Sequence, residues 1–279
     1  MTLWLWVMRP HRYNFLSYRS PVRLAGERYF TERILLFTWR YHHMIKAIFF
    51  DLDGTLLPMD QELFVKTYLE ALGKKMAVHG YDPRLLIKSI WAGTAAMVQN
   101  EGNCTNEEIF WKETAAQYGR DIRCDQEIFL EFYKNEFQEI RNVCGFTPQA
   151  AKSIRLLIKE GYRVILATNP LFPAIATYSR IRWAGLDPAD FELITTYENS
   201  TRCKPNPAYY QEILDKMDLK AEDCLMVGND AQEDMAAQET GMQVFLLTDC
   251  LINRQMSDIS LYPQGSFLEL LDFIEGFSI

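Results

Sequence analysis

The sequence predicts an α/β fold, an open parallel Rossmann-like sheet with an inserted α-helical bundle. Short apolar runs alternate with helical patterns along most of the chain, and one long helical stretch interrupts the alternation after the first run. Runs that are apolar throughout suit strands buried on both faces of a parallel sheet. Strands that alternate with helices are typical of doubly wound sheets. The 279 residues, of which 48% are hydrophobic, suffice for one large core and a smaller module.

Five runs are expected to form strands, and helices are expected between them. The strands are predicted at Ile45–Phe50, Tyr162–Ala167, Phe191–Thr195 (the weakest), Cys224–Val227 and Val244–Leu247. A helix begins at Thr147 and Pro148, an N-cap and first-turn pair, and ends at Gly161. Asn206–Met217 and Ala231–Gly241 show helical spacing as well.

Residues 59–146 are expected to be helical throughout. Asp60 is a candidate N-cap, Pro83 starts a second helix, and Thr105 with Glu108 has the pattern of a capping box. Asp125 precedes an aromatic stripe on one helix face, formed by Phe129, Phe132, Tyr133 and Phe137. We therefore predict a helical domain at 58–146, inserted into an α/β core made of 44–57 and 147–279.

Residues 1–43 differ from the rest and form an atypical N-terminal extension. They carry seven arginines, no lysine and two glutamates, a net charge of +5 that leaves −13 for the remainder. A targeting peptide, an accessory helix, and upstream sequence preceding a start at Met44 are the three interpretations, and the last is favoured.

Composition narrows the class of function. The acidic body is a poor partner for nucleic acid or an anionic membrane, and no apolar run approaches the roughly 18 residues of a membrane span. Six cysteines without a C-x-x-C pair indicate reduced thiols in a cytoplasmic protein rather than a zinc site.

The strongest chemical signal is the segment Asp-Leu-Asp-Gly-Thr-Leu at 51–56, directly after the first strand. In extended backbone, Asp51 and Asp53 point the same way, so both carboxylates are expected to face one site. Gly54 and Thr55 then form a turn whose backbone N–H groups can meet an anion. Ligands of open α/β sheets bind at the carboxyl ends of strands, where this segment falls.

Residues 51–56 resemble the first motif of the haloacid dehalogenase superfamily, and the other motifs follow in order. Thr168 and Asn169 close the second strand as that family's second motif does, and Lys204 precedes a helix where its lysine stands. Val227–Asp230 followed by Asp234 resembles its acidic fourth motif. The resemblance covers about residues 44–275 and is closest to phosphoglycolate phosphatase-like members, which carry a helical cap between motifs one and two.

The resemblance implies a role for each matching residue. Asp51 is the nucleophile that forms an aspartyl-phosphate, and Asp53 is the general acid and base. Mg²⁺ is implied as cofactor, held by the Asp51 carboxylate, the Asp53 carbonyl and the Asp230 carboxylate. The substrate phosphate meets Gly54, Thr168, Asn169 and Lys204. Asp234 supports the site by pairing with Lys204 or by holding a metal-bound water.

One departure from the family pattern leaves the metal ligand open. Relatives commonly have Gly-Asp where this chain has Gly228-Asn229-Asp230, so either Asn229 or Asp230 takes the inner place. The spacing from Asp230 to Asp234 favours Asp230. The presence of Asp53 argues against dehalogenase and phosphonatase activity, because family members with those activities lack an acid two residues after the nucleophile.

The implied activity is that of a phosphoric monoester hydrolase acting on a small phosphorylated metabolite. A helical cap excludes bulky substrates and water. Leu57–Met59 is expected to be its hinge, and Gln61, Phe64 and Lys66 are candidates to face substrate. A phosphomutase on a sugar phosphate and a non-catalytic binding domain are the alternatives. The protein is expected to be a monomer or homodimer without nucleic-acid or membrane partners.

Overall fold

The computed structural model describes residues 45–276, and the predicted extension 1–43 lies outside them. Its centre is a six-stranded sheet in the order β3-β2-β1-β4-β5-β6, in which every neighbouring pair is parallel. The strands are β1 Ala47–Phe50, β2 Arg163–Leu166, β3 Leu193–Ile194, β4 Cys224–Gly228, β5 Gln243–Leu247 and β6 Gln264–Gly265. The predicted α/β fold class is confirmed, and all five expected strands are present; only the two-residue β6 was not anticipated.

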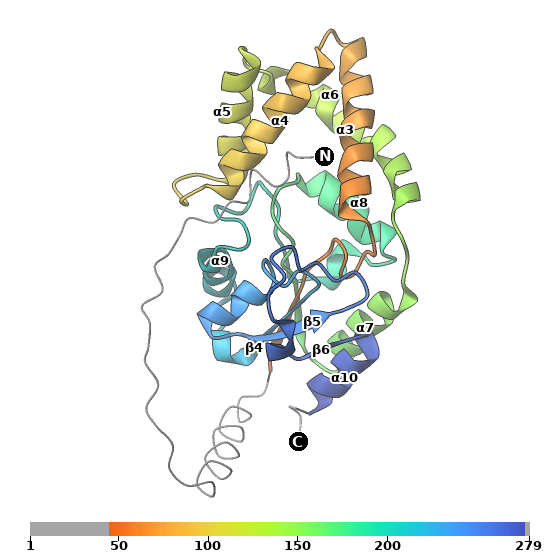
Figure 1. Cartoon of the computed structure of the whole chain (residues 1–279), viewed down its shortest axis with the longest axis vertical. Coiled ribbons are helices and arrows are strands. Elements are labelled where there is room, and N and C mark those ends of the chain that lie inside the picture. The colour runs from red at the N-terminus through yellow and green to blue at the C-terminus, as the bar shows by residue number, and fades with distance from the viewer. Residues whose placement is uncertain (1–44, 277–279) are drawn as a thin grey trace, which may run out of the picture. The chain divides into compact units, whose positions relative to one another are not determined.

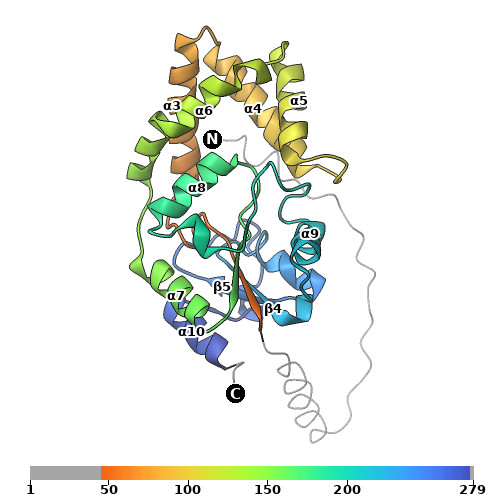
Figure 2. The ribbon, with the colours of Figure 1, turned by 180° about the vertical axis from the view of Figure 1, so that it is seen from behind.

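Helices cover both faces of the sheet because the strands are apolar on both faces. Ile48 and Phe50 of β1 pack in one buried cluster with α7 (Pro148–Lys159) and α10 (Phe267–Glu275). Ala47 and Phe49 pack in a second cluster with α9 (Pro207–Met217). Figures 1 and 2 show these helices beside the sheet. The core therefore consists of two layers of side chains, one on each side of the central strand.

The segment between β1 and α7 is helical and contains no named strand. Its elements are α3 Gln61–Val78, α4 Pro83–Val98, α5 Asn106–Tyr118, η1 Arg123–Asp125, α6 Gln126–Lys134 and η2 Glu136–Val143, where η denotes a 3₁₀ helix. The expected start signals act as predicted: Asp60 caps α3, Pro83 opens α4, and Thr105 with Glu108 closes a capping box on α5. In Figure 1 the α-helices of this segment gather at one end, away from α7 and α10.

The aromatic stripe does not lie on one helix as predicted. The helix ends at Lys134, and Phe137 lies in η2. Asn135 adopts a non-helical conformation, and its Nδ2 donates to the carbonyl of Glu131 at 2.9 Å. Such a local bond competes with helical geometry. The aromatic rings still meet, since Phe137 stands edge-on to both Tyr68 and Tyr133.

The predicted helix over Ala231–Gly241 is also wrong in type. Residues 231–234 form turns, and only Met235–Thr240 is helical, as the 3₁₀ helix η5. The Asp230 carboxylate accepts hydrogen bonds from the backbone N–H groups of Gln232 and Glu233 at 2.8 and 2.9 Å. These are the contacts of a helix N-cap, so the segment begins as the sequence predicts but continues as a 3₁₀ helix.

Two connections join the helical segment to the sheet, and they run side by side. Met59 forms an isolated antiparallel bridge with Cys144, and the N–H of Gly145 donates to the carbonyl of Pro58 at 2.7 Å. The expected hinge at Leu57–Met59 is thus one half of a paired connection. Among residues 45–276, no helix is long and apolar enough to cross a membrane.

Candidate active site

Strand pairing brings the predicted motifs to the same edge of the sheet. Phe50 lies level with Leu166 of β2 and Val227 of β4. The N–H of Asp51 donates to the carbonyl of Val227 at 2.9 Å, which anchors it where β1 ends. Parallel strands place their carboxyl ends together, so the polar residues that follow β1, β2 and β4 converge there.

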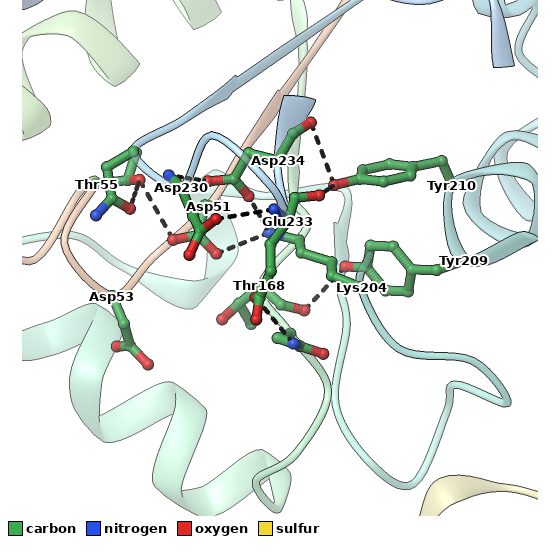
Figure 3. Close-up of polar contacts among 12 residues, drawn as sticks. Asp51, Asp53, Thr55, Thr168, Lys204, Tyr209, Tyr210, Asp230, Glu233 and Asp234 are labelled. Atoms are coloured by element: carbon green, nitrogen blue, oxygen red, sulfur yellow. Dashed lines mark hydrogen bonds and ion pairs between the residues drawn. The ribbon is translucent and has the colours of Figure 1, made fainter. Parts of the chain in front are cut away.

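The centre of the site is a buried ion triad of Asp51, Lys204 and Asp234. Lys204 is fully buried, and its Nζ lies 2.8 Å from Asp51 Oδ1 and 2.7 Å from Asp234 Oδ1. Burial opposes the charge of Lys204, but the two carboxylates hold its pKa well above the usual value. Figure 3 shows the three side chains in contact. The predicted pairing of Asp234 with Lys204 is therefore present.

The loop after Asp51 turns tightly around Gly54. Gly54 has φ +90°, and a Cβ there would lie 2.3 Å from Asn229 Nδ2, so the close approach requires glycine. The N–H groups of Gly54 and Thr55 donate to the carbonyls of Leu57 and Leu52. These two N–H groups, expected to meet an anion, are thus engaged within the loop, and Gly54 serves mainly to shape it.

Asp53 does not face the same partners as Asp51. Leu52 begins a turn, so the rule that alternate residues of extended backbone share a face no longer applies. The Asp53 carboxylate pairs with Arg180 of α8 (Ala174–Trp183). In Figure 3 it lies apart from the triad. Burial raises the pKa of Asp53 to about 6, although the Arg180 charge lowers it.

Asn229 and Asp230 have different surroundings. The amide of Asn229 is held at both ends: its Oδ1 accepts from the Thr55 hydroxyl at 2.9 Å, and its Nδ2 donates to the carbonyl of Cys250 at 2.6 Å. Asp230 Oδ2 accepts from Arg254 Nη1 at 2.7 Å. The backbone N–H of Asp230 donates to Asp234 Oδ2 at 2.9 Å, which links it to the triad.

Thr168 and Asn169 lie beside the triad at the end of β2. The carbonyl of Thr168 accepts from the hydroxyls of Thr195 and Tyr209 at 2.7 and 2.9 Å, which fixes the backbone. Asn169 Nδ2 donates to Glu233 Oε2 at 3.0 Å, and its Oδ1 is buried without a hydrogen-bond partner. The predicted phosphate donor Asn169 is thus close to the site but engaged with a carboxylate.

The three residues expected to face substrate lie in three different surroundings. Gln61 Nε2 donates to the Asp53 carbonyl at 3.3 Å, and Gln61 Oε1 accepts from Arg254 Nη2 at 2.9 Å. Phe64 is buried and Lys66 is exposed. Gln61 is therefore the one that connects the helical segment to the Asp51–Asp53 loop.

Sequence reasoning missed three charged residues of the site: Arg180, Glu233 and Arg254. Arg180 lies on a helix face with Ala176 and Ile181, both fully buried. Glu233 lies between Asp230 and Asp234 in the sequence, and the acidic composition of that segment is the only signal that indicates it. Arg254 follows β5 in a loop without any motif.

The donor chemistry of the site suits a hard divalent cation. The carboxylates of Asp51, Asp230, Glu233 and Asp234 lie near one another, whereas Lys204 and Arg254 are the cations paired with members of this set. Burial and then the charge of Asp230 raise the pKa of Glu233, as expected where negative charge is in excess. Residues 45–276 contain no cluster of three His, Cys, Asp or Glu side chains arranged for a metal. The expected set needs only two carboxylates and the Asp53 carbonyl, so the residues present fit Mg²⁺.

Known proteins resemble this chain over most of its length. A phosphoglycolate phosphatase of Aliivibrio fischeri is 27% identical over 209 residues, which cover 73% of this chain and 84% of that protein. The pyrophosphatase PpaX of Bacillus mycoides is 22% identical over 237 residues, covering 83% and 99%. The crystal structure of a 2-haloacid dehalogenase from Pseudomonas syringae pv. Tomato shares the fold, with a TM-score of 0.58, 19% identity and coverage of 85% and 100%.

A model of one enzyme family matches more than half of the chain. Its description is "haloacid dehalogenase-like hydrolase", and the match spans residues 45–239. That range contains β1, the helical segment, and every residue of the buried ion triad. The chain therefore belongs to the haloacid dehalogenase-like hydrolases.

Proposed function

We propose that this hydrolase is a Mg²⁺-dependent phosphatase that releases phosphate from a small phosphorylated metabolite through an aspartyl-phosphate. The observation that carries the proposal is the buried contact of Lys204 with Asp51 at 2.8 Å. A phosphate monoester and an attacking carboxylate repel each other, so a reaction between them needs fixed positive charge. Lys204 supplies such charge at the carboxylate that follows the first strand.

The first half-reaction transfers the phosphoryl group to the protein. A carboxylate oxygen of Asp51 bonds to phosphorus while the bond from phosphorus to the ester oxygen breaks. A proton from the Asp53 carboxyl group goes to the departing oxygen, so the product leaves as an alcohol. Lys204 orients Asp51 and offsets its charge, and Asp234 holds Lys204 from the other side at 2.7 Å.

The second half-reaction restores the protein. Asp53, now a carboxylate, takes a proton from water as the water oxygen bonds to phosphorus. The bond from phosphorus to Asp51 then breaks and inorganic phosphate leaves. When bound at Asp51, the Asp53 carbonyl and Asp230, Mg²⁺ supplies charge that offsets the negative oxygens of the phosphoryl group. We choose Asp230 over Asn229 because a charged carboxylate is a better ligand for Mg²⁺ than a neutral amide.

The helical segment supports a small substrate. We propose that residues 58–146 form a cap domain on a core made of 44–57 and 147–279, with Thr168 and Asn169 meeting the substrate phosphate. The relatives named phosphoglycolate phosphatase and pyrophosphatase suggest small phosphorylated compounds as the substrate class. A cytoplasmic location is part of the proposal, supported by six free cysteines.

Phosphate release from a panel of phosphorylated metabolites tests the proposal. The panel includes two-carbon and three-carbon phosphocarboxylates, sugar monophosphates, sugar bisphosphates and pyrophosphate, each with Mg²⁺ and with EDTA. We expect one or a few members to release phosphate only with Mg²⁺. Conversion of sugar phosphates into isomers without release would instead identify a phosphomutase. No reaction with any member would contradict the proposal.

A further inference from the structure

Arg180 of α8 is one of the most buried side chains of the described chain, although it carries a full charge. Its side chain is 1% exposed. Nε donates to the carbonyl of Ala176 at 3.4 Å, and Nη2 donates to the hydroxyl of Thr177 at 3.3 Å. Burying an arginine costs free energy unless its charge is compensated. The group that compensates the charge of Arg180 therefore indicates the role of this residue.

Aromatic rings fix the guanidinium in one place. Its central carbon lies 4.4 Å from the ring centre of Phe172 and 6.0 Å from that of Phe64. Phe172 belongs to the loop after β2, whereas Phe64 belongs to α3 of the helical segment, and the two rings meet edge-on. Contacts between a cation and an aromatic face are attractive. Arg180 is thus held between the sheet domain and the helical segment.

The compensating charge is the Asp53 carboxylate, and only one of its oxygens is used. Arg180 Nη1 donates to Asp53 Oδ2. The second oxygen, Oδ1, is buried and has no hydrogen-bond partner among residues 45–276. A buried carboxylate oxygen without a partner is unfavourable, so it calls for an explanation such as a catalytic role. Asp53 therefore has one oxygen anchored by Arg180 and one that no described residue hydrogen-bonds.

Each aspartate of the first motif has its own cation. Asp51 pairs with Lys204 of the turn before α9, and Asp53 pairs with Arg180 of α8. Figure 3 shows the two carboxylates separated accordingly. Without Arg180, no other described cation pairs with Asp53, and its side chain loses the contact that sets its direction.

We propose that Arg180 is a positioning residue that holds Asp53 Oδ2, so that Asp53 Oδ1 carries the proton exchanged with the leaving oxygen and then with water. The inference rests on the proposed phosphatase function and deepens it. Oδ1 gives its proton to the ester oxygen as the phosphorus–oxygen bond breaks, and later takes one from the attacking water. Oδ2 stays bonded to Arg180 throughout. Arg180 itself touches neither substrate nor phosphorus.

Leaving-group dependence tests this role. A metabolite leaves as an alcohol and needs a proton, whereas the nitrophenolate of p-nitrophenyl phosphate is a stable anion that needs little protonation. We expect R180M to lower kcat on the best metabolite of the panel by about 100-fold, within the range of general acid catalysis. On p-nitrophenyl phosphate the expected loss is below about tenfold. R180K, which keeps the charge, should recover part of the lost activity.

The matched control is R182M on the same helix, because Arg182 is exposed and should leave both activities unchanged. Melting temperatures provide a second readout that does not depend on turnover. R180M and D53N should each lower the melting temperature, because each leaves a buried partner without compensation. The melting temperature of the double variant should be higher than the sum of the two single losses predicts. Its turnover should be no lower than that of D53N.

Two results would overturn the inference. Equal losses on both substrates would show that Arg180 supports the fold or binding and not proton transfer. Additive effects of R180M and D53N on melting temperature would show that the ion pair does not form. A wild-type protein that releases no phosphate contradicts the proposed function and this role together, whereas an active wild type with equal losses contradicts only the role of Arg180.

Discussion

The D51N variant should lose phosphate release down to the background of the assay. The amide is a poor nucleophile, and removal of a covalent nucleophile typically costs at least about four orders of magnitude. Lys204 keeps Asp234 as a partner in this variant, so the fold should persist. Steady-state release of phosphate, with Mg²⁺ and the best substrate of the panel, measures the effect.

A stability measurement serves as the control for D51N. The unfolding free energy of D51N should fall with urea concentration at the same slope, and as cooperatively, as that of the wild type. The loss of turnover would then come from the missing nucleophile and not from a damaged fold. A matched control is D60N, because Asp60 caps α3 through Leu63 and does not belong to the triad. Substantial turnover by folded D51N would remove Asp51 from the nucleophile's role.

The K204M variant should lose both activity and stability. Methionine keeps much of the volume of the side chain but leaves the carboxylates of Asp51 and Asp234 buried without their cation. Breaking a buried pair by removing one partner costs about 3–5 kcal/mol. Turnover should fall by about 10²–10³-fold or more, the usual cost of removing one charged or hydrogen-bonding group from a reacting centre. Urea unfolding and phosphate release measure the two effects.

Lys216 offers the matched control for K204M. It also pairs with a carboxylate, Glu212 at 2.6 Å, but its side chain is 40% exposed. K216M should therefore cost less than about 1 kcal/mol and leave turnover unchanged. Adding D234N to K204M should recover part of the stability, because one uncompensated charge is removed, but no activity. Equal stability of K204M and wild type would contradict the buried triad.

The strands could be predicted because their burial appears directly in the sequence. Runs such as Cys224–Val227 are apolar at every position, which strands covered on both faces require, and they are too short for a typical helix. Helix starts were equally readable where a side chain caps them, as at Asp60 and Thr105. Periodicity misled the prediction at Asn135, where a side chain bonds to the backbone inside the expected helix.

The site could be predicted only as far as its motifs extend. Asp234 was expected to pair with Lys204 or to hold a metal-bound water, and the structure shows the pairing, with Asp51 as the second partner of Lys204. Arg180 could not be found, because an arginine among apolar helix positions gives no sign that it is buried until its tertiary partner is known. The prediction that Asp53 faces the same site as Asp51 assumed extended backbone after Asp51. The backbone turns at Leu52 instead, so the two side chains have different partners.

Trapping the phosphorylated protein tests the central claim most directly. The wild type is mixed with substrate and Mg²⁺, quenched in acid and reduced with borohydride, which converts an aspartyl-phosphate to homoserine. Peptide mass spectrometry then locates the modified position, with D51N treated in parallel. The account predicts homoserine at position 51 in the wild type and none in D51N. Phosphate release without homoserine at position 51, or with the label at another aspartate, would contradict it.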